Sequence, residues 1–139
     1  MTSHKKLIIH TDGGARGNPG PAGIGVVIAD DKKKVINEIA EYIGETTNNQ
    51  AEYRAVLRAM EEAKKLDAEE LVFYLDSELV VKQLKLEYKV KNKELAPLFF
   101  KIYNLSQQFK KVTFFHVRRE FNKAADLLVN KAVDKYLNK

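Results

Sequence analysis

Two aspartates stand at places where the sequence predicts the end of a buried strand. Asp12 follows the run KLIIHT at residues 6–11, and Asp76 follows LVFYL at residues 71–75. Short apolar runs rich in β-branched and aromatic residues are typical of strands inside a sheet. In open α/β sheets, ligands bind beyond the carboxyl ends of the strands. We therefore expect these two carboxylates to lie side by side if their strands are neighbours.

Two further acids fall near the start of predicted helices. Glu52 shares the apolar stripe of its helix, so helical geometry turns its charge towards the sheet. That stripe consists of Ala55, Val56, Ala59, Met60 and Ala63. Asp126 borders the apolar stripe of the last helix, which consists of Ala125, Leu128, Val129, Ala132, Val133 and Tyr136. A carboxylate on the buried side of a helix needs a partner.

Clustered carboxylates repel one another unless a cation compensates their charge. Hard oxygen ligands favour Mg²⁺ or Mn²⁺, and the chain has no cysteine for a zinc site. Two such ions roughly 3.5 to 4 Å apart form the general clamp for phosphodiester displacement. Taken singly, each acid has a structural alternative as a turn former or as a complement to a helix dipole. Their joint placement favours a metal site, and we predict as metal ligands and catalytic residues Asp12, Glu52, Asp76 and Asp126.

The first part of the chain predicts an antiparallel meander. Strands are expected at residues 6–11, 24–29 and 34–43, with a charged turn between the last two. Residues 13–25 (GGARGNPGPAGIG) hold six of the seven glycines and two of the three prolines. This composition predicts turn-forming backbone rather than a regular element.

The rest of the chain alternates helices with strands. The period of three to four residues predicts an amphipathic helix at residues 49–66, capped by Thr47, Asn48 or Asn49. The later elements expected are a strand at 71–75, a short helix at 77–84, a helix at 94–109, a strand at 112–117 and a helix from about 122. The predicted fold class is α/β: one domain over residues 1–139, with a five-stranded mixed sheet (three antiparallel strands, then two parallel) and helices on both faces.

Composition narrows the class of partner. The 24 lysines and arginines outweigh the 19 acids, and the formal net charge of +5 favours polyanions. The absence of cysteine excludes a disulfide framework and a thiol nucleophile. The apolar run before Asp12 is too short for a signal peptide or a membrane span, so we expect a cytoplasmic protein that does not interact with membranes.

Four segments together resemble type 1 ribonuclease H, and the resemblance spans nearly the whole chain. They are residues 11–25 (TDGGARGNPGPAGIG), 46–60 (TTNNQAEYRAVLRAM), 76–84 (DSELVVKQL) and 117–132. The resemblance implies the ribonuclease H-like fold and an endonuclease that hydrolyses the RNA strand of RNA/DNA hybrids, leaving 5′-phosphate and 3′-hydroxyl ends. It implies two Mg²⁺ ions during catalysis, with Mn²⁺ as an alternative, and it assigns the metal to the same four acids.

The resemblance also implies residues that bind the substrate. Asn18 and the run at residues 48–50 match positions that contact the minor groove and the RNA sugars, and amides suit 2′-hydroxyls that both donate and accept. Thr47 and Asn92 match a pocket for a phosphate of the DNA strand. The full expected set is Gly13, Gly14, Asn18, Thr47, Asn48, Asn49, Gln50, Ser77 and Asn92. For Asn48 and Asn49, helix capping is an equally good interpretation.

The chain departs from the family at Glu45, where some members carry a basic residue of the phosphate pocket, and in two longer segments. Many members insert an extra helix and a basic loop after the position of Gln83, whereas this chain has only a short connector with Lys85, Lys89, Lys91 and Lys93. Many members also carry a histidine in the loop before the last acid, whereas the loop here reads RREFN at residues 118–122. We predict an auxiliary role for Arg118 and Glu120 there, and an exposed charged turn is the alternative.

Two other functions compete with the hybrid nuclease. A non-catalytic module that binds hybrids or double-stranded RNA would keep the amides and lysines but lose at least one acid. A related nuclease acting on DNA is disfavoured by the intact TTNNQAEYRAV and GNPGP segments. We expect a monomer whose partner is an RNA/DNA hybrid duplex, with double-stranded RNA as a second candidate.

Overall fold

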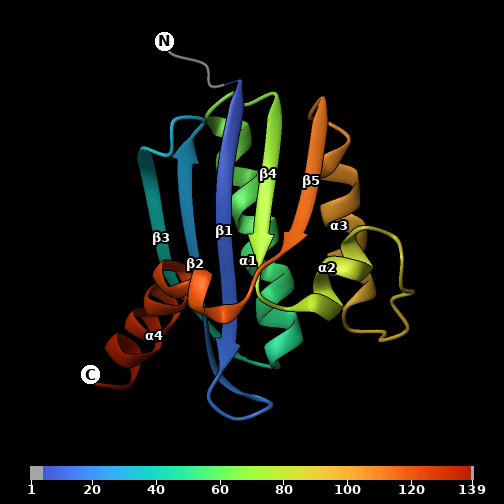
Figure 1. The fold of residues 1–139 in the computed structure, drawn as a ribbon. Coiled ribbons are helices and arrows are strands. Elements are labelled where there is room, and N and C mark those ends of the chain that lie inside the picture. Colours follow the sequence, from blue (N-terminus) through green and yellow to red (C-terminus); the bar gives the residue numbers. More distant parts are fainter. Residues whose placement is uncertain (1–4, 139) are drawn as a thin grey trace.

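The chain folds around one five-stranded mixed sheet with the strand order β3-β2-β1-β4-β5 (Figure 1). The computed structural model describes residues 5–138. The first three strands, β1 (Lys6–Ala15), β2 (Gly20–Asp30) and β3 (Val35–Thr46), pair antiparallel. The last two, β4 (Glu70–Leu75) and β5 (Lys111–His116), extend the sheet parallel to β1. The predicted fold class is confirmed.

Helices cover both faces of this sheet. α1 (Asn48–Lys65) and α3 (Ala96–Ser106) lie behind it in Figure 1, and α4 (Lys123–Leu137) lies in front of β2 and β3. The short α2 (Glu78–Leu84) follows β4. The main core fills the space between the sheet and α1, with fully buried Leu7, Ile9, Tyr53, Met60 and Phe73. Within residues 5–138 no helix is both long and apolar enough to cross a bilayer.

The prediction that residues 13–25 form only turns is wrong. β1 continues to Ala15 and β2 begins at Gly20, so the turn is confined to residues 16–19. The reason is packing: a Cβ on Gly13 would overlap the backbone of Ala51 in α1, and a Cβ on Gly25 would overlap the backbone of Ala125 in α4. The glycines let two helices approach the strands closely.

Most other boundaries differ from the predictions by a few residues. α1 begins almost where its period predicts, and Thr47 caps it by accepting a hydrogen bond from the Gln50 backbone at 3.2 Å. α3 is shorter than the predicted 94–109 at both ends, and the Asn92 side chain accepts from the backbone N–H of Glu94 in the turn that precedes it. A 3₁₀ turn, η1 (Arg119–Phe121), precedes α4.

Candidate active site

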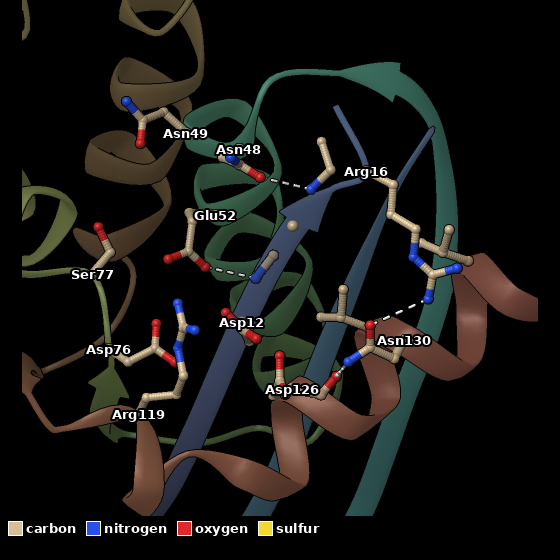
Figure 2. Close-up of a pocket in the computed structure, with 15 residues that line it drawn as sticks. Asp12, Arg16, Asn48, Asn49, Glu52, Asp76, Ser77, Arg119, Asp126 and Asn130 are labelled. Carbon is tan, nitrogen blue, oxygen red and sulfur yellow. Dashed lines mark hydrogen bonds between the residues drawn. The ribbon is translucent and has the colours of Figure 1, made fainter. Parts of the chain in front are cut away.

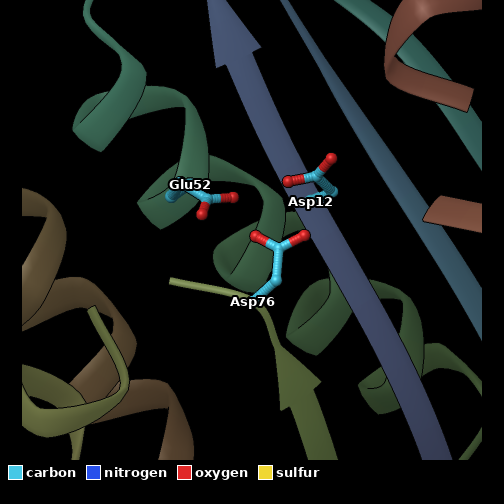
Figure 3. A group of neighbouring side chains, drawn as sticks. All are labelled: Asp12, Glu52 and Asp76. Carbon is cyan, nitrogen blue, oxygen red and sulfur yellow. The ribbon is translucent and has the colours of Figure 1, made fainter. Parts of the chain in front are cut away.

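Three carboxylates from three elements meet at one edge of the sheet. One oxygen each of Asp12, Glu52 and Asp76 lies within 4.8 Å of the others (Figure 3). Asp76 directly follows β4, as predicted, but Asp12 lies inside β1 rather than beyond its end. The parallel pairing of β1 with β4 puts the two aspartates on neighbouring strands. Among residues 5–138, this is the one group of three or more potential metal-ligating side chains within that distance.

Glu52 is held in place by the strand it faces. The backbone N–H of Gly13 donates to Glu52 Oε1 at 2.6 Å (Figure 2). Gly13 therefore has two roles: its lack of a side chain lets α1 pack closely on β1, and its backbone N–H bonds the Glu52 carboxylate of α1. Glu52 and Asp12 are only 7% and 8% exposed, so both residues are nearly removed from water.

Asp126 lies on the other side of Asp12 in the same cleft. It sits in the first turn of α4, which packs on the opposite face of the sheet from α1. Figure 2 shows its side chain beside Asp12. It is not part of the three-carboxylate group, so the predicted set of four acids consists of two buried acids, Asp12 and Glu52, and two half-buried acids, Asp76 and Asp126.

Burial and neighbouring charges raise the pKa of two of these acids, Asp12 and Glu52. Burial, reinforced by the charge of Asp76, raises the pKa of Asp12 to about 7. Burial, followed by the charges of Asp12 and Asp76, raises the pKa of Glu52 well above its ordinary range. A divalent cation would relieve this repulsion, and the all-oxygen donor set suits a hard ion. The cluster therefore fits a divalent-metal site.

The cleft around the acids has a volume of about 440 Å³. Of the predicted substrate-binding residues, it is lined by Gly13, Gly14, Asn48, Asn49 and Ser77. The other four, Asn18, Thr47, Gln50 and Asn92, lie outside its lining.

Several of the residues predicted to contact the substrate also form hydrogen bonds within the protein. Asn48 Oδ1 accepts from the Ala15 backbone at 2.8 Å, and Asn18 Oδ1 accepts from the Asn48 backbone at 3.0 Å. Gln50 Nε2 donates to Glu94 at 2.5 Å, which joins the start of α1 to the segment before α3. Ser77 caps α2. These bonds shape the cleft wall, while contact with a substrate stays a prediction.

The loop before α4 has two arginines that could hold a substrate phosphate, Arg118 and Arg119, and only Arg119 lines the cleft. Arg118 and Glu120 form an ion pair at 3.5 Å, and their side chains are 80% and 57% exposed. Arg119 instead lines the cleft, and Figure 2 shows it beside Asp76. Arg16 and Asn130 line the cleft too and were not predicted. Nothing in the local sequence distinguishes Arg119 from Arg118, because a single 3₁₀ turn decides which one faces inward.

Comparison with known proteins agrees with this geometry. A family model described as reverse transcriptase-like matches residues 10–132. Ribonuclease HI of Halobacterium salinarum is 37% identical over 123 residues, which are 88% of this chain and 62% of that protein. A bifunctional protein of Mycobacterium tuberculosis is 42% identical over 130 residues, 93% of this chain. The chain spans 36% of the length of that mycobacterial relative.

Solved structures give the same result. LC11-RNase H1, isolated from compost by a metagenomic approach, superposes with a TM-score of 0.89 at 49% identity, covering 96% of this chain and 99% of that one. A second crystal structure of LC11-RNase H1 is a complex with an RNA/DNA hybrid. The chain therefore belongs to the reverse transcriptase-like family, and its relatives place it with the type 1 ribonucleases H within that family.

Proposed function

We propose that this protein is an endonuclease that hydrolyses the RNA strand of RNA/DNA hybrids and leaves 5′-phosphate and 3′-hydroxyl ends. The observation that carries the proposal is the group of Asp12, Glu52 and Asp76, whose oxygens lie within 4.8 Å at the base of an open cleft. The hybrid bound by LC11-RNase H1, which is 50% identical over 94% of this chain, supports the choice of substrate.

We propose two Mg²⁺ ions as the cofactor, with Mn²⁺ as a substitute. The three clustered acids would hold them together with Asp126 on the far side of Asp12. When bound, such ions activate a water molecule and neutralise charge on the phosphate that is attacked. The protein contributes a fixed arrangement of carboxylates on rigid elements, which positions the reacting groups before the substrate arrives.

Specificity for hybrids would come from the shape of the cleft wall. Asn49 is exposed in the cleft, and its amide can both donate to and accept from a 2′-hydroxyl on the RNA strand. The DNA strand would reach the segment near Thr47 and Asn92. Glu94 lies beside that segment and bonds Gln50, so a phosphate there would meet a negative charge. We expect a weaker grip on the DNA strand as a result.

A non-catalytic module for hybrids or double-stranded RNA is the second candidate. It would have no need of buried, mutually repelling acids, which cost free energy in a protein that never binds a metal. Cleavage of double-stranded RNA, a monomeric state and a cytoplasmic location stay predictions from the sequence.

One assay tests the proposal. Labelled RNA/DNA hybrid, RNA duplex and DNA duplex are each incubated with Mg²⁺, Mn²⁺ or EDTA, and the ends of the products are mapped. We expect metal-dependent cleavage of the RNA strand of the hybrid, and none by Asp12→Asn. The matched control is Asp67→Asn, an exposed site with φ 59° that asparagine tolerates. Wild-type activity in a pure Asp12→Asn preparation would exclude this mechanism.

A further inference from the structure

Asn122 lies where three acid-bearing segments meet. The residue is 1% exposed, and its Nδ2 donates to the backbone carbonyl of Thr11 at 2.9 Å and to Asp76 Oδ2 at 3.3 Å. Its own backbone carbonyl accepts from the N–H of Asp126 at 3.1 Å. One residue thus contacts the strand next to Asp12, the carboxylate of Asp76 and the turn that carries Asp126.

We infer that Asn122 is a positioning residue, which orients Asp76 and anchors the turn of Asp126 so that the cluster can bind divalent ions. The inference rests on the proposed function. Among residues 5–138, the bond from Asn122 is the one hydrogen bond to the Asp76 carboxylate. Partners that hydrogen-bond a metal-ligating carboxylate set its orientation, and their loss weakens metal binding.

Helix capping does not explain this amide. Asn122 occupies the position before the first residue of α4, where an asparagine side chain usually accepts from the helix backbone. Here the side chain makes no capping bond and turns instead towards β1 and Asp76. The orientation of the amide is unambiguous, because both of its partners on this side are acceptors and only the Nδ2 end can donate.

The buried oxygen of the same amide supports a constrained role. Asn122 Oδ1 is buried and has no hydrogen-bond partner among the described residues. Leaving a buried acceptor unpaired costs free energy. On its outer side Asn122 borders a mainly apolar hollow, and its neighbours in the chain there, Phe121 and Ala124, have apolar side chains. The two hydrogen bonds donated by Nδ2 therefore fix the orientation of the amide, although this orientation leaves Oδ1 without a hydrogen-bond partner among the described residues.

Two substitutions separate positioning from simple stabilisation. Asn122→Ala removes the donor, and Asn122→Asp keeps the shape but replaces the donor with a charge that repels Asp76. We expect kcat on the hybrid to fall by about 10- to 100-fold and half-saturating Mg²⁺ to rise by about tenfold, with KM for the hybrid changed less than about twofold. Raising Mg²⁺ should partly restore Asn122→Ala.

Metal binding without substrate gives an independent readout. Calorimetric titration of the substrate-free protein, or the amide shift of Gly13 against added Mg²⁺, should show a similar loss of affinity, about tenfold. Gln83→Ala is the matched control, because Gln83 is also a buried amide and does not line the cleft. Its Oε1 accepts a hydrogen bond from the Tyr53 hydroxyl at 2.6 Å. That variant should lose stability and keep its Mg²⁺ affinity.

The outcomes are distinguishable. Unchanged Mg²⁺ affinity and half-saturation in both Asn122 variants would overturn the inference, even if their melting temperatures fell as far as that of Gln83→Ala. If the wild type cleaves no hybrid, the proposed function fails, and the titration still tests the positioning role. Should a variant be unfolded at the assay temperature, the same titration is run at a lower temperature at which that variant is folded.

Discussion

At the scale of single residues, the acids make stability depend on pH and metal. The pKa of Asp12 is raised from 3.8 to about 7, so between these values the folded state binds more protons than the unfolded state. Stability must then fall as pH rises through that window and level off above it. The pKa of Glu52 is also raised and adds to this effect.

Asp12→Asn should therefore stabilise the metal-free protein at pH 8. We expect its melting temperature in EDTA to exceed that of wild type by roughly 3 to 8 °C at pH 8, with the gap closing towards pH 4. Mg²⁺ should raise the wild-type melting temperature and have little effect on the variant. Thermal melts over this pH range with and without Mg²⁺ check both points, and parallel curves for the two proteins would contradict them.

The loop before α4 allows a second test on single residues. Because Arg119 lines the cleft, Arg119→Ala should raise KM for the hybrid by about threefold or more. Arg118 and Glu120 form an exposed ion pair, and such pairs contribute little. Arg118→Ala and Glu120→Gln should each change kcat and KM by less than about twofold. A stronger effect from Arg118→Ala would show that the loop changes conformation on the substrate.

At the scale of elements, neighbouring glycines in β1 should respond very differently to an added methyl group. A Cβ on Gly13 would overlap the Ala51 backbone, which cannot move without shifting α1, whereas a Cβ on Gly14 meets the Val129 side chain at an ordinary 3.6 Å. We expect Gly13→Ala to cost about 1 to 3 kcal/mol and Gly14→Ala less than about 1 kcal/mol. Urea unfolding measures both, and equal losses would argue against the close approach of α1.

The lysine-rich connector between α2 and α3 should act through charge alone. Lys89, Lys91 and Lys93 are exposed and make no ion pair among those of the described residues. If they neutralise substrate phosphates, replacing all three with alanine should flatten the log-log dependence of hybrid affinity on salt, by roughly 0.9 for each phosphate that is no longer neutralised. Replacing Lys32, Lys64 and Lys65 removes the same charge elsewhere, and an equal change of slope would assign the effect to net charge.

Across the whole molecule, the features that could be predicted were those that produce a local pattern in the sequence. The amphipathic period of α1 and the apolar runs of β1 and β4 predicted the elements that bring Asp12, Glu52 and Asp76 together. The glycine-rich segment was misinterpreted, because close packing of helices distant in the sequence overrides its turn propensity. Asn122 matches the family within residues 117–132, but its role could not be predicted, since its amide bonds a carbonyl 111 positions earlier in the chain.

The bond between Asn122 and Thr11 joins the first strand to the last helix. Asp126 reaches the cleft, and Asn122 reaches β1 and Asp76, only when α4 has docked on β2 and β3. A polypeptide still emerging from the ribosome can therefore display three of the acids while lacking the fourth and the amide that steadies them. If hydrolysis requires Asp126, as proposed above, the chain can gain that activity only after α4 has left the exit tunnel.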